Sequence, residues 1–323
     1  MCKTVGQGKS SFLSPAPPIP NTEHLSPNTY HPICLPPNTY HPIPIAQYAY
    51  HPIPMTQYLR PFLVGLQLDI AWEDKAVTHE RVRDLLEGQA FPRGSLLALP
   101  EMFSTGFSMN VPAIAEGPDR PTEHFLSSLA AERGIFVLGG VVNRAPDGRG
   151  RNEARLYGPE GEERLRYQKI HPFRYGGETS YFEPGSQLAL FEWNGFHAAP
   201  FICYDLRFPE VFRQSVRDGA DLLIVIANWP RPREEHWMAL LKARAIENQS
   251  YVMGVNRCGS DPNVSYSGRS QIIGPRGNIL VDAGEGEGLF HISPDRDDLI
   301  AYRAEFPALV DINPAFLGER MEL

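Results

Sequence analysis

Three residues that lie far apart in the chain have types and surroundings suited to covalent chemistry. Cys203 directly follows the apolar run 199–202 and is itself followed by charged residues, as where a strand turns into a helix. A residue at such a turn is well placed to expose a nucleophilic side chain. Glu101 follows an apolar strand and a proline, where a rigid, partly dehydrated carboxylate can transfer protons. Lys169 closes another apolar strand, where a fixed ammonium can stabilise an oxyanion. No histidine is needed, because a carboxylate can take the thiol proton and a lysine can stabilise the thiolate.

Each of the three residues also has a purely structural explanation. Most cysteines in apolar runs are inert core residues, an acid at a strand end is ordinarily a surface group, and a lysine beside apolar residues can lay its stem along them. The combination is more specific than any one member, but it requires a fold that brings the three side chains together.

The spacing of apolar residues predicts alternating strands and helices from Phe62 onward. Trp237, Leu241 and Ala245, for example, recur at helical spacing, and residues 158–161 form a hairpin signal between two strand-like runs. This alternation implies α/β layers, with helices covering sheet faces, and residues 61–323 can form one domain. The predicted strands are 62–70, 96–100, 134–142, 153–157, 163–168, 188–193, 197–203, 222–227, 252–255, 270–273 and 279–281, and the predicted helices are 75–90, 121–133, 209–219 and 234–248.

The order and spacing of the three candidate residues resemble the Glu–Lys–Cys triad of the nitrilase (carbon–nitrogen hydrolase) superfamily. The matching motifs are Pro100-Glu101, Lys169-x-His171 and Cys203-Tyr-Asp-x-Arg-Phe-Pro209, and the resemblance covers essentially all of 61–323. It implies a four-layer α-β-β-α sandwich that pairs into a homodimer, and hydrolysis through a cysteine thioester without a metal or organic cofactor. In this scheme Glu178 supports the lysine and substrate, and the backbone N–H of Tyr204 helps to hold the oxyanion.

Further motifs are similar to those of the bacterial omega-amidases, which hydrolyse 2-oxoglutaramate and 2-oxosuccinamate. They are Ala227-Asn-Trp-Pro230, His236-Trp237, the run 243–249, Val255-Asn-Arg-x-Gly-Ser-Asp261 and Tyr302-Arg-x-Glu-Phe-Pro307. The resemblance places Asn228 and Trp229 in the substrate site. The far carboxylate of such a substrate needs a cation, for which Arg207 and Arg174 are candidates, although either can instead pair with acids of the protein.

Other functions remain open at this point. The same chemistry can act on deaminated glutathione, on N-carbamoyl compounds or on nitriles, and the Asn228-Trp-Pro230 run favours the omega-amide. A non-catalytic binding protein can share the fold, but a missing triad residue would be expected in such a protein and none is missing.

Residues 1–60 differ from the rest of the chain. They hold 12 of the 31 prolines and repeat Pro-Asn-Thr-Tyr-His-Pro-Ile with a period of ten residues. Such a tract lacks the amide donors for a ladder and predicts a disordered or extended leader. The recurring histidines allow weak metal binding, the prolines allow docking to a partner domain, and Met55 is a reasonable alternative start.

Overall composition narrows the partners and the location. A net charge of -8 and a pI of about 5.7 argue against nucleic acid or an anionic membrane as the main partner. The charge says nothing about small substrates, and the small-molecule amide substrate is what the family resemblance implies. No apolar run approaches the roughly 20 residues needed to span a bilayer, and the N-terminus shows no secretory signal. Of four cysteines, two lie in the leader, so a disulfide framework is not expected and a cytoplasmic location is predicted.

Overall fold

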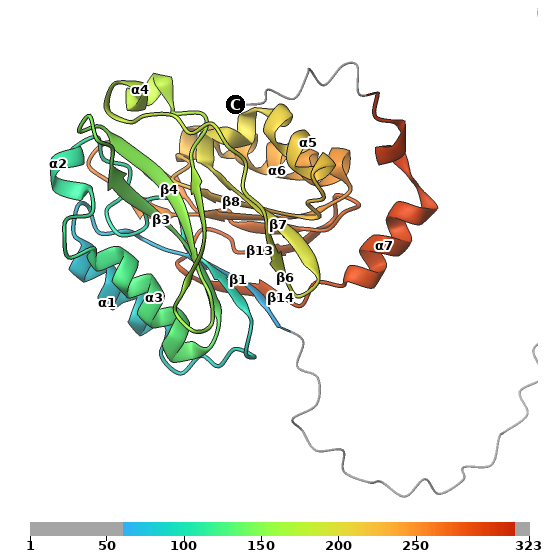
Figure 1. Cartoon of the computed structure of the whole chain (residues 1–323), viewed down its shortest axis with the longest axis horizontal. Helices are drawn as coiled ribbons and strands as arrows, with labels where there is room; N and C mark the ends of the chain where they lie inside the picture. Colours follow the sequence, from blue (N-terminus) through green and yellow to red (C-terminus); the bar gives the residue numbers. More distant parts are fainter. Residues whose placement is uncertain (1–60, 314–323) are drawn as a thin grey trace, which may run out of the picture. The chain divides into compact units, whose positions relative to one another are not determined.

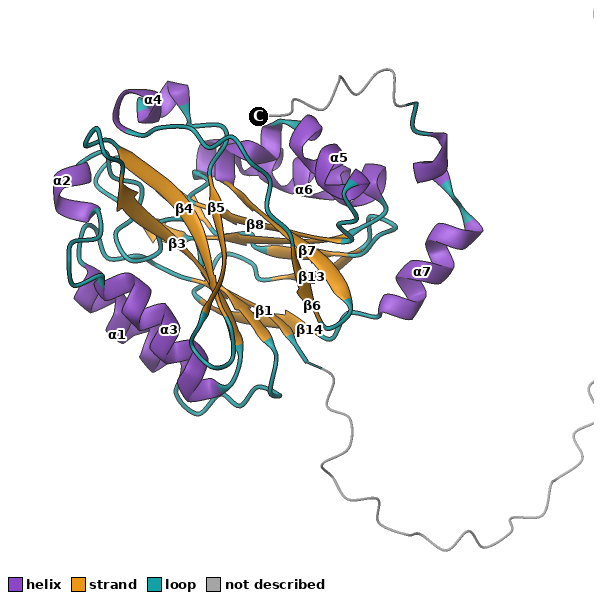
Figure 2. Ribbon diagram, viewed as in Figure 1, coloured by secondary structure: helices purple, strands orange, loops and turns teal. Residues whose placement is uncertain are grey.

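The computed structural model describes residues 61–313, and the predicted leader and the last ten residues lie outside the described range. Two six-stranded sheets form its centre (Figures 1 and 2). The first has the order β14-β1-β2-β3-β4-β5, with β14 Gly288–Ile292, β1 Leu63–Gln67, β2 Leu96–Ala98, β3 Phe136–Arg144, β4 Gly150–Tyr157 and β5 Glu163–Gln168. The second has the order β13-β12-β9-β8-β7-β6, with β13 Ile279–Asp282, β12 Gln271–Ile273, β9 Tyr251–Asn256, β8 Leu222–Ala227, β7 Phe196–Ile202 and β6 Phe191–Trp193.

Helices cover the outer face of each sheet, which gives the predicted α-β-β-α order (Figure 1). The first sheet is covered by α1 Lys75–Leu86 and α3 Pro121–Arg133, and the second by α5 Pro209–Arg217 and α6 Glu234–Asn248. The remaining elements are α2 Val111–Ile114, α4 Glu178–Tyr181, α7 Arg296–Glu305, the hairpin β10 Cys258–Ser260 with β11 Ser265–Ser267, and the 3-10 helices η1 Arg174–Gly176, η2 Cys203–Arg207, η3 Arg231–Arg233 and η4 Ala308–Asp311.

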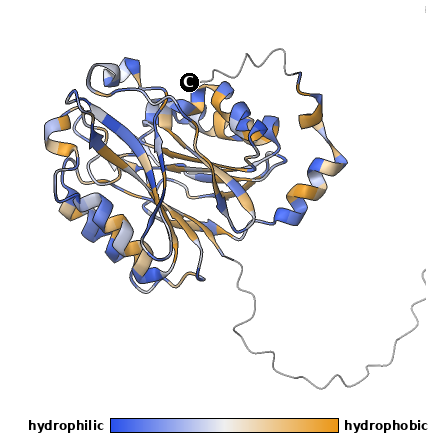
Figure 3. Cartoon of the chain, in the orientation of Figure 1, coloured by the Kyte–Doolittle hydropathy of each residue, from blue (hydrophilic) through white to orange (hydrophobic). Residues whose placement is uncertain are grey.

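The first sheet is apolar on both faces because its side chains alternate between two cores. On β2, Leu96 and Ala98 join the core between the sheets, whereas Leu97 packs with residues of the covering helices, such as Val82 and Leu126. Figure 3 shows hydrophobic residues along the strands, and hydrophobic residues alternating with hydrophilic ones along α1 and α3. The sheet is therefore held from both sides, as a layer buried in a sandwich must be.

The second sheet positions the predicted nucleophile. All six residues of β8 are buried, and β8 pairs in parallel with β7 and β9. Trp237, Leu241 and Ala245 on α6 pack into the same core, as their helical spacing predicted. Cys203 comes directly after β7, at the end of the sheet where the neighbouring strand β8 also ends.

The sequence located many elements well, and four of them to the residue: α3, β5, β8 and α6. The β4–β5 hairpin is also confirmed. The predicted strand 197–203 is shifted by one residue from β7, because Phe196 already belongs to the strand and Cys203 leaves the sheet and starts η2. The predicted strand 62–70 ends at Gln67 and the predicted helix 75–90 ends at Leu86. No helix within residues 61–313 has the length and hydropathy needed to cross a bilayer.

Candidate active site

Glu101 lies in a tight turn after β2, fixed by backbone contacts with β3. The turn is closed by Met102, whose φ of +43° is in the left-handed region, and by Gly140 of β3, whose N–H donates to the Pro100 carbonyl at 3.1 Å. The Glu101 side chain is fully buried. Its Oε2 accepts the backbone N–H of Asn228 at 2.9 Å, and its own carbonyl accepts the Asn228 side-chain amide at 2.6 Å. The carboxylate therefore has a single fixed orientation.

Lys169 joins two carboxylates in the interior. It follows β5, and its Nζ lies 2.8 Å from Glu101 Oε1 and 2.8 Å from Glu178 Oε2. The side-chain amide of Asn152 on β4 donates to the same two acids, at 2.7 Å to Glu101 and 3.0 Å to Glu178. All four side chains are buried. The structure thus brings together the two predicted glutamates and the predicted lysine, and adds Asn152, which the sequence analysis did not single out.

The charges of this cluster keep the lysine protonated. Burial alone would lower the pKa of Lys169, but the carboxylates of Glu101 and Glu178 outweigh burial and hold that pKa well above its usual value. Burial raises the pKa of Glu178, against the lowering effect of Lys169. Glu178 opens α4 and also accepts the backbone N–H of Phe173, which adds a further fixed contact to the carboxylate. A fixed cation inside the protein is therefore available beside Glu101.

Cys203 is mounted on a strained elbow. Its φ of +46° is unusual for a residue with a side chain, and such a conformation costs about 1–3 kcal/mol that the surroundings must offset. The buried carboxylate of Asp205 supplies much of this support, since it accepts the Ile202 N–H at 3.0 Å, the Tyr167 hydroxyl at 2.7 Å and the His171 N–H at 2.9 Å. The elbow is tied in this way to β7 and to the segment that carries Lys169.

Cys203 is buried, with 8% of the residue exposed. Burial raises its pKa well above the usual value, the charge of Glu101 raises it further, and the charge of Lys169 lowers it. Glu101 and Lys169 therefore both lie near enough to the thiol to influence its pKa. The arrangement can transfer the thiol proton to Glu101 when the sulfur attacks an electrophile.

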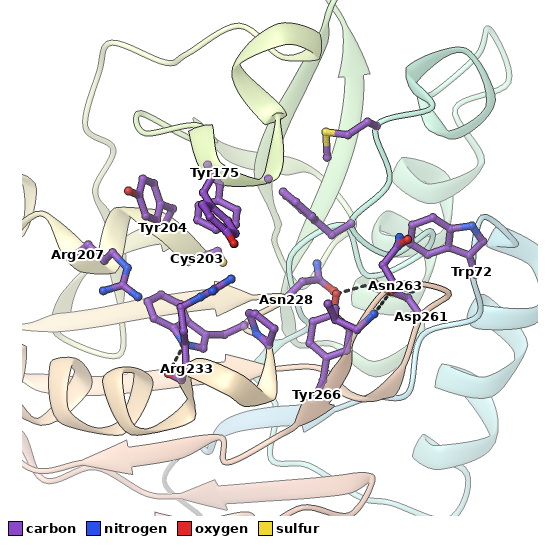
Figure 4. Close-up of a pocket in the computed structure, with 17 residues that line it drawn as sticks. Trp72, Tyr175, Cys203, Tyr204, Arg207, Asn228, Arg233, Asp261, Asn263 and Tyr266 are labelled. Atoms are coloured by element: carbon purple, nitrogen blue, oxygen red, sulfur yellow. Dashed lines mark hydrogen bonds between the residues drawn. The ribbon is translucent and has the colours of Figure 1, made fainter.

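A cavity of about 390 Å³ opens over Cys203 (Figure 4). This size falls at the lower end of the roughly 300–1,000 Å³ found for small-molecule sites. The Phe107 ring belongs to its wall and lies 5.3 Å from Lys169 Nζ, so the lysine sits directly behind the lining. Its other aromatic walls are Trp72, Phe173, Tyr175, Tyr204, Trp229 and Tyr266. No group of three or more His, Cys, Asp or Glu side chains within residues 61–313 is arranged to hold a metal ion.

The predicted substrate-binding residues have different positions. Arg207, Asn228 and Trp229 line the cavity. The side-chain amide of Asn228 is engaged with Glu101, so this residue also fixes the carboxylate. Arg174 is exposed and does not line the cavity. Arg233 does line it, although the sequence analysis did not single out this residue.

Comparison with known proteins identifies the family of this chain. Residues 64–304 match the carbon-nitrogen hydrolase family. The chain is 33% identical over 248 residues to a 2-oxoglutaramate amidase of Bacillus subtilis (76% of this chain, 95% of the relative) and 36% identical over 248 residues to the omega-amidase YafV of Escherichia coli K12 (76% and 94%). The crystal structure of XC1258 from Xanthomonas campestris, a CN-hydrolase superfamily protein with an arsenic adduct in its active site, superposes with a TM-score of 0.73 at 35% identity (79% and 97%).

The chain therefore belongs to the carbon-nitrogen hydrolase family, the nitrilase superfamily that its motifs resemble. Within that family its relatives fall in the omega-amidase branch, and the chain is a hydrolase that acts on carbon–nitrogen bonds in amides.

Proposed function

We propose that this enzyme hydrolyses a short linear omega-amide of a carboxylic acid, of the 2-oxoglutaramate or 2-oxosuccinamate type, to the acid and ammonia. The observation that carries the proposal is the cluster of Glu101, Lys169 and Glu178 directly behind a small cavity that Cys203 lines. The names of the relatives, 2-oxoglutaramate amidase and omega-amidase, support the substrate class.

In the first half-reaction the Cys203 sulfur attacks the amide carbon while its proton passes to Glu101. The carbonyl oxygen becomes an oxyanion, which Lys169 and the backbone N–H of Tyr204 stabilise. Glu101 then returns the proton to the departing nitrogen, so that ammonia leaves and a thioester remains on Cys203. The raised pKa of the buried thiol fits this order, because the proton stays on sulfur until the attack begins.

In the second half-reaction Glu101 takes a proton from water, whose oxygen attacks the thioester carbon. The oxyanion again forms beside Lys169, and its collapse breaks the carbon–sulfur bond. The proton held by Glu101 returns to the sulfur, which restores the resting thiol and releases the carboxylic acid. Glu178 and Asn152 take no part in bonding changes in this scheme, and they hold Lys169 and Glu101 in place.

The test of the proposal is ammonia release from a panel of omega-amides, N-carbamoyl amino acids, deaminated glutathione and nitriles. We expect the highest kcat/KM for short amides with a carboxylate beyond the scissile group. Mass spectrometry of rapidly quenched protein should show an acyl adduct on the peptide that contains Cys203. Faster turnover of nitriles or of N-carbamoyl compounds than of 2-oxoglutaramate would refute the substrate assignment.

The proposal extends to the working form of the enzyme, a cytoplasmic homodimer. The resemblance to the family supports the dimer, and exposed apolar side chains such as Ile246 on α6 and Ile300 on α7 are available for contacts. The two described cysteines, Cys203 and Cys258, are both free, as expected in a reducing compartment. Light scattering of the purified enzyme should give twice the mass of the chain, and a monomeric mass would contradict this part of the proposal.

A further inference from the structure

Two arginines line the cavity, and they differ in what surrounds them. Within residues 61–313, neither Arg207 nor Arg233 forms an ion pair with an acid. The Arg207 guanidinium lies 3.1 Å from His236 Nδ1 and 4.9 Å from the centre of the Trp229 ring. The Arg233 guanidinium lies over Phe173 at 5.4 Å and over Tyr175 at 5.5 Å. Because aromatic rings carry no net charge, these contacts leave the positive charge of Arg233 without a counter-ion.

The backbone holds Arg233 in place at the edge of the cavity. Its N–H donates to the Pro230 carbonyl at 3.0 Å, and its own carbonyl accepts the Trp229 indole N–H at 2.7 Å. The residue immediately precedes α6, and in Figure 4 its side chain rises from the start of that helix towards Tyr175. A cation on a fixed backbone loses less freedom when it binds an anion than one on a loose loop.

The acid that lines this cavity does not compete for the arginine. Asp261 Oδ1 accepts the backbone N–H groups of Asn263 and Val264 at 2.7 and 2.9 Å, and its Oδ2 accepts the Tyr266 hydroxyl at 2.6 Å. Figure 4 shows Asp261 at the opposite end of the cavity from Arg233. The two ends of the cavity therefore carry opposite charge. The carboxylate of Asp261 is hydrogen-bonded within the protein, whereas the guanidinium of Arg233 has no acidic partner among the described residues.

We infer that Arg233 is the residue that selects the substrate, by binding the carboxylate at the far end of the omega-amide. The guanidinium presents N–H donors in a planar fork that matches a carboxylate, and the aromatic walls hold the chain of the substrate between this anion site and Cys203. The inference rests on the proposed function, since it concerns the same cavity and reaction.

The experiment compares an anionic omega-amide, 2-oxoglutaramate, with a neutral amide of the same length, its methyl ester. R233Q should lose about 30-fold or more in kcat/KM for the anion, mainly through KM, and far less for the ester. R233K should recover part of the loss because it keeps the charge without the fork. R231Q is the matched control: Arg231 lies two residues upstream, is exposed and pairs with Glu285 at 2.8 Å outside the cavity.

Three results would overturn the inference. An equal loss on both amides would mean that Arg233 only supports the aromatic wall. An unchanged preference for the anion in R233Q would exclude it as the anion site. A loss confined to R207Q would assign the anion to Arg207 instead. Absence of ammonia release by the wild-type enzyme from both amides would refute the proposed function, so the two failures are distinguishable.

Discussion

Replacing Gly140 by alanine should displace Glu101, the proposed proton acceptor. Gly140 lies on β3, where a Cβ would stand 2.3 Å from the Met102 nitrogen and 2.6 Å from the Glu101 Cα. Both neighbours are backbone atoms, so no side chain can rotate away. The backbone of Gly140 is outside the left-handed region, and the conflict is therefore one of space alone.

The size of the displacement follows from these distances. Ordinary contact with a Cβ begins near 3.4 Å, so the Met102 nitrogen and β3 must separate by about 1.1 Å, which is 3.4 minus 2.3. A misplacement of about 1 Å can reduce a rate by about 10²-fold, which corresponds to about 2.7 kcal/mol in the barrier. Overpacking also costs about 1–3 kcal/mol of stability. We expect the kcat of G140A to fall about a hundredfold while the protein still folds.

The assay is ammonia release by G140A, with the folded fraction measured by circular dichroism. G139A is the matched control, because a Cβ on the adjacent Gly139 would meet side-chain atoms of Leu126 at 2.9 Å and Phe103 at 3.1 Å. This variant should lose stability and keep most of its kcat. A folded G140A enzyme with more than half of the wild-type kcat would refute the reasoning, as would an equal loss of kcat in G139A.

Three further predictions concern the nucleophile, the response to pH and the leader. C203S and C203A should remove turnover while the circular dichroism spectrum stays native; more than a few per cent of activity in purified C203A would exclude Cys203 as the nucleophile. Burial lowers the pKa of His79 from 6.5 to about 4, so the unfolded chain binds the proton more readily and stability should fall as pH drops from about 6.5 towards 4. Because His79 is partly exposed, the expected loss in the free energy of unfolding is roughly 1–3 kcal/mol. Urea unfolding of the wild type and of His79→Leu at pH 7 and pH 5 measures this loss. An equal pH dependence in both proteins would show that another group causes it. Removal of residues 1–54 should leave ammonia release and the melting temperature unchanged, because all three triad residues and the first strand, β1, lie beyond Met55; a large fall in either would show that the leader contributes.

The sequence predicted best what depends on local pattern. The helical spacing of Trp237, Leu241 and Ala245 located α6, and the apolar run Leu222–Ala227 located β8. It missed α7, in which Leu299 is the one buried residue, so no apolar face marks the helix. It also missed β14, whose pairing with β1 depends on residues more than two hundred positions away.

The residues of the candidate site fall into the same two groups, those that a local motif identifies and those that only the fold identifies. Glu101, Lys169, Glu178 and Cys203 were identified through motifs, whereas Asn152 lies in the middle of a strand with no local feature that separates it from other polar strand residues. Its role depends on the register of β4 against β5, which places its carbonyl against the Lys169 N–H at 2.9 Å. Arg233 was missed because two arginines and two glutamates crowd residues 231–235, and only the structure shows which arginine faces the cavity.

The charges of the buried cluster explain why the substrate's anion must be bound elsewhere. Lys169 contributes one positive charge against the carboxylates of Glu101 and Glu178, so a thiolate on Cys203 would add a further negative charge inside the protein. Transfer of the thiol proton to Glu101 avoids this, because the net charge of the cluster is the same before and after the transfer. A substrate carboxylate placed beside the cluster would be repelled for the same reason. An omega-amide meets both requirements: its neutral amide group can lie at Cys203 while its carboxylate is held apart at the cationic end of the cavity, where Arg233 and Arg207 lie.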